Sequence, residues 1–268
     1  MALLLKRCYL FYNWAMHDVS DTRTNDLPLV KSIFYPLTII GIYIYFVLHF
    51  GPRLMKNRKP FDLNKLLIVY NALQVAYCTI IVYEASRTVL FKYDWRCAPV
   101  DYANTKEAKY VTRLVWSYYM IKIADLLDTV FFVLRKKSNQ VTFLHVYHHA
   151  GMVMMTWGAT KFFPGGHCIY LGVINCFVHA VMYIYYLLTA YDSEYKNSIW
   201  WKKHITQLQL MQFTFFSLIY GQILFRPDCQ FPRWTQIVFL PQNAFMMMLF
   251  GDFYYKTYIK TKPAIIAE

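Results

Sequence analysis

Apolar residues are arranged along this chain in long blocks. Seven apolar runs occur at about residues 30–51, 66–86, 114–134, 141–160, 168–189, 205–225 and 234–255. Each is about 20 residues long, which suits a helix crossing a hydrocarbon layer about 30 Å thick. The runs are apolar on all sides, so the amphipathic periodicity of a soluble fold is not what they indicate. We therefore predict an all-α membrane protein with seven transmembrane helices and a single domain over residues 1–268.

Composition agrees with this interpretation, since 57% of the residues are hydrophobic and only 16% are charged. The opening "MALLLKRCYL" is too short, and too soon interrupted by Lys6 and Arg7, to be a secretory signal. We expect it to remain as the N-terminal segment of the mature protein, with the first long run acting as the insertion signal.

Basic residues predict the orientation of the spans. If the N-terminus is lumenal, the basic segments 52–65, 135–140, 196–203 and 256–262 are all cytosolic. The loops 161–167 and 226–233 on the other side hold few cations, and acidic residues dilute those of the loop 87–113. The positive-inside rule then places the C-terminus in the cytosol. The net charge of +13 indicates this topology and an anionic partner at the cytosolic face, not a nucleic acid.

The six cysteines include no C-x-x-C pair, so we predict no zinc or thioredoxin-like site. Cys97 and Cys229 fall in two loops on the predicted outer side. In an oxidising lumen they would form a disulfide, and the alternative is two free thiols.

Charged residues interrupt the third run, "YYMIKIADLLDTVFFVLRKK". Lys122, Asp125, Asp128 and Thr129 recur at i, i+3, i+6 and i+7, which places them on one stripe of a helix. Such groups are costly in a membrane unless they are paired or face a wet cavity, so they predict a functional interior site. The alternative is a structural Lys122–Asp125 pair that holds helices together.

Three histidines stand in the fourth run, "LHVYHHAGM", at i, i+3 and i+4: His145, His148 and His149. They share one helix face. The link "RKKSNQ" is short, so the third and fourth helices should be antiparallel neighbours. His148 and Asp128 then both lie about 10 Å from the link, at the same depth. This pattern favours proton transfer, nucleophilic attack or metal binding over a lone structural histidine.

The next two runs add polar side chains at a similar depth. The polar face of the fifth run comprises Asn175, His179, Met182, Tyr183 and Tyr186, and that of the sixth comprises Thr206, Gln209 and Gln212. Glutamines also hold membrane helices together, so a structural role for them stays open. The lumenal halves of these helices are nearly all apolar. We predict a reactive chamber open to the cytosol that continues into an apolar blind tunnel.

Taken in order, "KIADLLDT", "HVYHH", "NCFVHAVMYIYY" and "TQLQLMQ" resemble the motifs of the very-long-chain fatty acid elongases. These are membrane 3-ketoacyl-CoA synthases of the endoplasmic reticulum. "GPRLMKNRKPFDL" extends the similarity, which covers about residues 30–255. The resemblance implies that the second to seventh helices form a six-helix barrel around a narrow acyl tunnel. It also implies condensation of a long-chain acyl-CoA with malonyl-CoA, with loss of CO2 and CoA and no cofactor beyond the thioesters.

The motif match implies roles for individual residues. The implied catalytic residues are His145, His148, His149, His179, Asp125 and Asp128. The implied substrate-binding residues are Lys122, Thr129, Asn175, Met182, Tyr183, Tyr186, Thr206, Gln209 and Gln212. The basic residues expected at the chamber mouth, which bind CoA phosphates or only set the topology, are Arg135, Lys136, Lys137, Lys202 and Lys203.

No cysteine lies in the motifs, so imidazole is the remaining strong nucleophile. We expect His148 or His179 to attack the acyl thioester, with His145 or His149 as base. The alternative is a direct condensation of the two bound thioesters without a covalent intermediate.

The expected surroundings are the bilayer of the endoplasmic reticulum, with a homodimer and other enzymes of the elongation cycle as candidate partners. The C-terminus "KTKPAIIAE" departs from the family in lacking a dilysine retrieval signal. One rival interpretation is a di-iron desaturase or hydroxylase, but only four histidines fall in the predicted chamber, too few for its ligands. Another is a receptor or channel, which would carry polar residues through the full membrane depth.

Overall fold

The computed structural model describes residues 1–260. Lys262, and the C-terminal segment in which a dilysine signal would stand, lie outside the described residues. The N-terminal half holds α1 (Ala2–Asn13), η1 (Trp14–Val19), η2 (Thr22–Thr24), α2 (Phe34–Tyr45), η3 (Phe46–Phe50), α3 (Gly51–Met55), α4 (Asn64–Ala85), η4 (Ser86–Leu90), α5 (Lys106–Ala124) and α6 (Leu126–Leu134). The remainder holds η5 (Ser138–Gln140), α7 (Phe143–Phe162), α8 (Cys168–Tyr191), η6 (Ser193–Asn197), α9 (Ile199–Leu224), α10 (Thr235–Tyr254) and η7 (Tyr255–Lys260). No strand occurs between residues 1 and 260, so the all-α prediction is confirmed.

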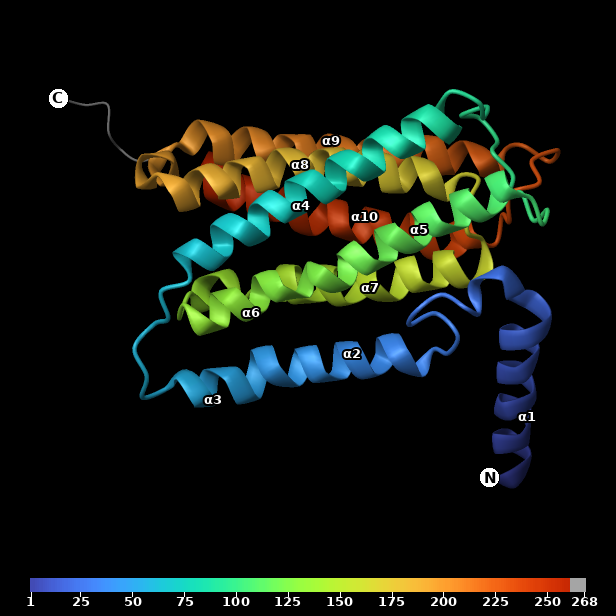
Figure 1. Ribbon diagram of the computed structural model, residues 1–268, viewed down its shortest axis with the longest axis horizontal. Coiled ribbons are helices and arrows are strands. Elements are labelled where there is room, and N and C mark those ends of the chain that lie inside the picture. Colours follow the sequence, from blue (N-terminus) through green and yellow to red (C-terminus); the bar gives the residue numbers. More distant parts are fainter. Residues whose placement is uncertain (261–268) are drawn as a thin grey trace. The chain divides into compact units, whose positions relative to one another are not determined.

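The helices group into two compact units, each built from two separate segments of the chain (Figure 1). Unit 1 comprises Met1–Phe61 and Pro99–Ile169, and therefore α1 to α3 and α5 to α7. Unit 2 comprises Asp62–Ala98 and the chain from Tyr170 onward, and therefore α4, nearly all of α8, α9 and α10. The single domain predicted over the whole chain stays a prediction.

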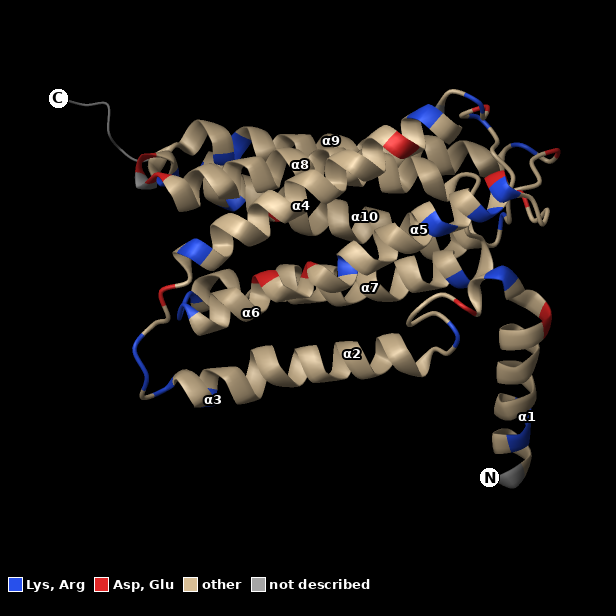
Figure 2. Ribbon diagram, viewed as in Figure 1, with Lys and Arg blue, Asp and Glu red and all other residues tan. Residues whose placement is uncertain are grey.

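Three helical stretches are long and apolar enough to cross a membrane: Phe34–Met55, Asn64–Val89 and Cys168–Tyr191. They correspond to the first, second and fifth predicted runs, and they make the chain a multi-pass membrane protein. The other four runs fall on α5 with α6, α7, α9 and α10, whose apolar stretches contain charged residues, histidines or amides. The count of seven spans stays a prediction. Lys and Arg gather mainly near helix ends and in loops (Figure 2).

In unit 1, the segment that precedes α2 is tied to α5 and α7 by side-chain hydrogen bonds. Trp116 Nε1 donates to Pro28 O at 3.0 Å, and Trp157 Nε1 donates to Val30 O at 3.1 Å. Lys161, a buried side chain of α7, donates to Asn25 Oδ1 at 2.6 Å. The two tryptophans thus bind backbone carbonyls of a non-helical segment, of which Val30 is buried, and Lys161 binds the side-chain oxygen of Asn25.

In unit 2, α9 and α10 pack along each other. The buried Asn243 of α10 donates to Phe213 O and to Ser217 Oγ of α9, each at 2.8 Å. Pro241 lies inside α10 and has no backbone N–H to donate. Asn243 thus gives this pair of helices a polar link within one turn of the proline.

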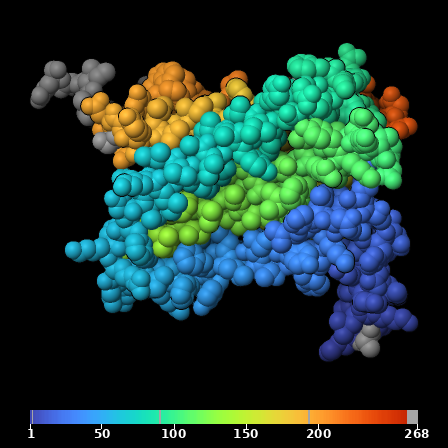
Figure 3. All heavy atoms as spheres, in the orientation of Figure 1, coloured from blue at the N-terminus to red at the C-terminus, as the bar shows by residue number. Residues whose placement is uncertain are grey.

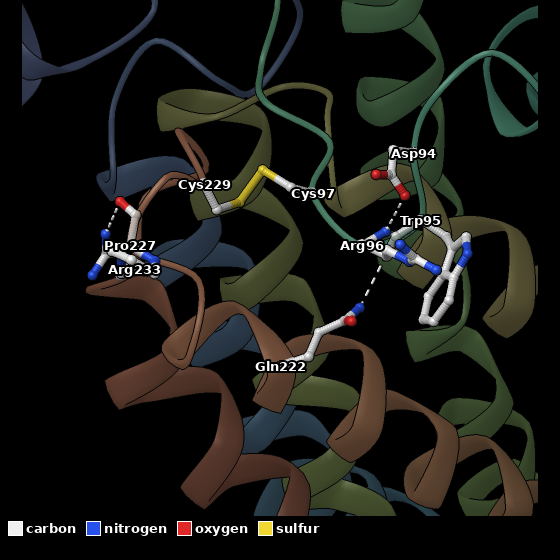
Figure 4. The surroundings of a disulfide bond; sticks show 8 residues. All are labelled: Asp94, Trp95, Arg96, Cys97, Gln222, Pro227, Cys229 and Arg233. Atoms are coloured by element: carbon white, nitrogen blue, oxygen red, sulfur yellow. Dashed lines mark hydrogen bonds between the residues drawn. A yellow bond between two sulfur atoms is a disulfide. The ribbon is translucent and has the colours of Figure 1, made fainter.

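A disulfide joins Cys97 to Cys229, the two loop cysteines singled out from the sequence, with their Cα atoms 5.6 Å apart (Figure 4). Both loops belong to unit 2. Gln222 Nε2 donates to Trp95 O at 3.2 Å beside the disulfide, and Arg233 donates to Pro227 O in the second loop. The loop that follows α4 is thereby fastened to the loop between α9 and α10.

Candidate active site

The polar stripe predicted over residues 122–129 is interrupted in the structure by a break at Asp125. α5 ends at Ala124 and α6 begins at Leu126. Asp128 N donates to Asp125 O at 3.2 Å, a bond from residue i+3 to residue i that belongs to a tighter turn than the α-helix. Lys122 pairs with Asp125 at this turn, whereas Thr129, one turn further on, contacts Tyr43 of α2.

Lys122 and Asp125 form the first pair. Their Nζ and Oδ2 atoms are 2.9 Å apart, and each side chain is only 2% exposed. Lys122 Nζ also lies 5.1 Å from the centre of the Tyr118 ring, which is a favourable site for a cation. The ion pair lies within one turn of the chain, so it does not itself join two helices. Removing both charges from water costs free energy that their mutual attraction often does not repay. Stabilisation of the fold alone therefore explains the presence of this ion pair poorly.

Asp128 and Thr129 lie beside α2. Thr129 is fully buried, and its Oγ1 is 2.8 Å from the hydroxyl of Tyr43. The charge of Asp128 also acts on Tyr43. Tyr43 was not singled out in the sequence, because one tyrosine in an apolar run gives no signal of its own.

The three histidines of the fourth run form one cluster on the first turns of α7. The rings of His145 and His149 are 4.2 Å apart, and those of His148 and His149 are 5.4 Å apart, edge to face. α7 begins here because Thr142 caps it, accepting a hydrogen bond from His145 N at 3.2 Å. Counted from His145, the three histidines stand at i, i+3 and i+4 of this helix and so share a face, as the spacing predicted.

This histidine cluster lies near the buried ion pair, because α5 packs along α7. The charge of Asp125 acts on the rings of both His145 and His148, and that of Lys122 acts on His148. His145 Nε2 is buried and makes no hydrogen bond within the part of the chain that the structure describes. An unsatisfied buried ring nitrogen costs about 1–3 kcal/mol, so its retention points to a use in ligand binding or chemistry.

The polar groups of unit 2 are mostly neutral. The buried Asn175 Nδ2 donates to Gln212 Oε1 at 3.3 Å. This bond orients the Gln212 amide so that its NH2 group is the end left to donate to a ligand. Gln209 Nε2 lies 3.9 Å from Met182 Sδ, and Thr206 Oγ1 donates to Lys202 O of its own helix at 2.9 Å.

His179 is buried in α8 among aromatic side chains of the same unit. Its ring lies 5.8 Å from that of Tyr183, and Tyr183 contacts Tyr186 and Tyr70 edge to face at 6.0 Å each. The buried Gln74 of α4 donates to Tyr70 Oη at 2.8 Å and to Tyr183 Oη at 3.4 Å.

Tyr70 and Gln74 were missed in the sequence. Their signal was available, because "YNALQ" places Asn71 and Gln74 three residues apart inside an otherwise apolar run. Both amides are buried.

The basic residues expected to contact CoA lie at helix ends. The set comprises Arg135, Lys136 and Lys137 after α6, and Lys202 and Lys203 in the first turns of α9. Lys136 and Lys202 are exposed, and Lys136 Nζ donates to Lys56 O at 3.2 Å. Their exposure suits them for contact with a soluble anion or with lipid headgroups, and the geometry favours neither.

Among the residues that the structure describes, no group of three or more His, Cys, Asp or Glu is arranged to hold a metal ion. The histidine cluster is instead accompanied by an ion pair and aromatic rings, with Phe132 5.2 Å from His145. The arrangement suits proton transfer or nucleophilic attack by imidazole.

Comparison with known proteins gives a consistent result. The ELO family, described as GNS1/SUR4, matches residues 28–265. A very long chain fatty acid elongase of Aedes aegypti is 42% identical over 98% of this chain and 73% of its own length. Elongase 1 of Homo sapiens is 43% identical over 91% of this chain and 88% of its own, and elongase 7 of Rattus norvegicus is 41% identical over 96% and 92%. The desaturase or hydroxylase alternative gains no support from these relatives. The chain therefore belongs to the ELO (GNS1/SUR4) family.

Proposed function

We propose that this protein is a very-long-chain fatty acid elongase, an acyltransferase that condenses a long-chain acyl-CoA with malonyl-CoA. The products are a 3-oxoacyl-CoA two carbons longer, CO2 and free CoA. The observation that carries the proposal is the histidine cluster of α7 beside the buried Lys122–Asp125 pair. The cluster and the ion pair offer a nucleophile, a base and charged groups at one buried site. The similarity to the elongase relatives supports the same reaction.

The first proposed step is transfer of the acyl group to a histidine. A ring nitrogen of His148 attacks the thioester carbon, the C–S bond breaks, and CoA leaves as a thiolate that takes up a proton. The acylated ring gives its remaining N–H proton to a neighbouring base, for which His145 and His149 are the candidates. Asp125 stabilises the transient positive charge on these rings. His179 stays the alternative nucleophile.

The second proposed step forms the new carbon–carbon bond. Malonyl-CoA loses CO2, and the electron pair released becomes an enolate of acetyl-CoA. The enolate carbon attacks the acyl-imidazole carbon, the C–N bond breaks, and the histidine regains its proton. We assign amide groups such as that of Gln212 to hold the thioester oxygen on which negative charge develops. The direct condensation without an acyl-histidine is the competing mechanism.

The wider setting is part of the same proposal. We propose seven membrane spans, with the second to seventh forming a six-helix barrel around a narrow acyl tunnel, and a single functional domain. The N-terminus lies in the lumen of the endoplasmic reticulum and the C-terminus in the cytosol, as the basic segments indicate. The exposed lysines at the ends of α6 and α9 bind the phosphates of CoA. A homodimer and other enzymes of the elongation cycle are the candidate protein partners.

The test is condensation by the purified protein in detergent or nanodiscs. Labelled malonyl-CoA is supplied with a panel of acyl-CoAs that differ in length and unsaturation, and 3-oxoacyl-CoA and CO2 are measured. We expect both products in equal amounts, and only when an acyl-CoA is present. Release of CO2 that does not depend on acyl-CoA, or no product with any acyl-CoA, would contradict the proposal.

A further inference from the structure

The N-terminal helix α1 is too short to cross a membrane, yet its surface is largely apolar. Its twelve residues span about 18 Å at 1.5 Å per residue, and the helical stretch 2–19 that α1 forms with η1 is not among the three described stretches long and apolar enough to cross a membrane. Its large apolar side chains are from 55% to 67% exposed: Leu3, Leu4, Leu5, Tyr9, Leu10 and Phe11. In Figure 3, the atoms of α1 project away from the rest of the N-terminal segment of unit 1. Such a surface needs an apolar environment that unit 1 does not supply.

The C-terminal end of α1 and the following η1 contact unit 1 close to the start of α2. Met16 of η1 is buried in the core of unit 1 beside Val30 and Trp157. Tyr12, one turn earlier, has its hydroxyl 3.4 Å from Ser32 Oγ and its ring 6.1 Å from the ring of Phe34, the first residue of α2. The C-terminal end of α1 is therefore held at the level where α2 starts.

The direction of α1 relative to the membrane follows from these contacts with the start of α2. α2 is the first part of the candidate span Phe34–Met55, so its first residue marks one surface of the membrane. Within unit 1, α1 runs across the direction of α2 and away from it (Figure 1). A helix that runs across the end of a membrane span follows the membrane surface.

The two faces of α1 differ in charge, as an orientation along the membrane surface requires. At about 100° per residue, Cys8 and Tyr12 mark the middle of an apolar arc. That arc also contains Leu4, Leu5, Tyr9 and Phe11. The opposite arc holds the two cations, Lys6 and Arg7, on either side of Leu3 and Leu10, and all four are exposed. All the positive charge of α1 therefore lies opposite the uncharged arc. Since Tyr12 contacts the first turn of α2, the apolar arc faces the side on which α2 enters the bilayer.

We propose that α1 is an in-plane anchor whose apolar arc lies in the boundary between headgroups and acyl chains of the same bilayer that the protein spans. Apolar and aromatic residues on one face, with Lys and Arg on the other, are the pattern of interfacial helices. Trp14, 52% exposed just after α1, is a residue type that favours this boundary. The proposal is independent of the condensation chemistry.

The test uses Cys8, the exposed free cysteine of α1. A nitroxide is attached to Cys8 of the full-length protein, which is reconstituted in phosphatidylcholine vesicles. Power saturation then compares its collisions with oxygen, which enters the bilayer, and with a water-soluble nickel chelate. The C8S variant measures background labelling, and the variants L4C/C8S and K6C/C8S place the label one turn earlier on the same arc and on the opposite arc.

We expect oxygen to dominate at positions 4 and 8, at depths within about 3 Å of each other, and the nickel chelate to dominate at position 6. A depth difference of about 6 Å between positions 4 and 8 would overturn the proposal, because that is the rise of an upright helix over four residues. Nickel dominance at all three positions would place α1 in water. Exclusion of both reagents at position 8, with dipolar broadening between labels, would show that a second copy covers the helix. Either result also overturns the proposal.

Discussion

The polar groups buried in unit 1 differ in kind from those buried in unit 2. In α5 to α7 they are ionisable. They comprise the Lys122–Asp125 pair and three imidazoles, of which the ring of His149 lies 4.2 Å from that of His145 and 5.4 Å from that of His148. In α4, α8 and α9 they are mainly amides and phenols, such as Gln212, which binds Asn175, and Tyr183, which lies beside His179. Imidazole and carboxylate groups exchange protons near neutral pH, whereas amides do not titrate and phenols do so only at about pH 10.

The difference separates two demands of the proposed condensation. Making and breaking the acyl bond needs a nucleophile and a base, and unit 1 offers both within one cluster. Stabilising an oxyanion needs donors that do not change their charge, and unit 2 offers oriented amides. Each of the following substitutions tests the role of the polar groups in one of the two units.

The largest effect is expected for His148→Ala in unit 1. We expect loss of at least about 10³-fold in condensation, since the nucleophile is removed, with little change in thermal unfolding temperature. His49→Ala is the matched control, because that ring is exposed on η3 outside the cluster, and it should retain normal activity. Activity of H148A above about a tenth of normal would remove His148 from the chemistry.

Lys122→Met should cost about 3–5 kcal/mol of unfolding free energy, because the buried carboxylate of Asp125 would lose its cation. The double variant Lys122→Met with Asp125→Leu should regain most of that stability without regaining activity. Reversible unfolding in mixed micelles and the condensation assay measure the two effects separately. An active double variant would mean that the pair is structural.

Cys97→Ser should destabilise unit 2 by about 2–4 kcal/mol, since it removes the disulfide that fastens its two loops. Hydrogen exchange should rise in α4 and α9 and stay unchanged in α7 of unit 1. Cys8→Ser, which removes an exposed free thiol, is the control and should change neither. Equal loosening of both units would argue that they unfold together.

The smallest effect is expected for Gln212→Ala, about 10- to 100-fold in kcat, as for loss of one hydrogen bond of about 1.5–3 kcal/mol to a charged group. Gln207→Ala is the control on the same helix, because Gln207 donates to Tyr254 Oη at 2.8 Å and has no part in the proposed site. If both variants lose the same activity, the amides of α9 only stabilise the helix.

Much of the histidine cluster was predictable, because residues at i, i+3 and i+4 of a helix share a face whatever surrounds them. The break at Asp125 was not, since a tightened turn inside an apolar run leaves no mark in the residue pattern. The contact of Thr129 with the hydroxyl of Tyr43 on α2 was not predictable either, because it depends on how α2 packs against α6.

The sequence also left α1 without a predicted structure, because a short apolar segment is ambiguous until its neighbours are known. Gln74 shows the opposite case: its signal was present but was overlooked in a run judged only by its apolar content.

The most direct measurement of the central claim is peptide mapping by mass spectrometry after incubation with a long-chain acyl-CoA alone. Without malonyl-CoA the second step is blocked, so the acyl-imidazole should accumulate. We predict an acyl adduct on the peptide that contains His148, absent from H148A and discharged when malonyl-CoA is added. An adduct on the peptide that contains His179, or no adduct on a protein that still condenses, would contradict the assignment of the nucleophile to unit 1.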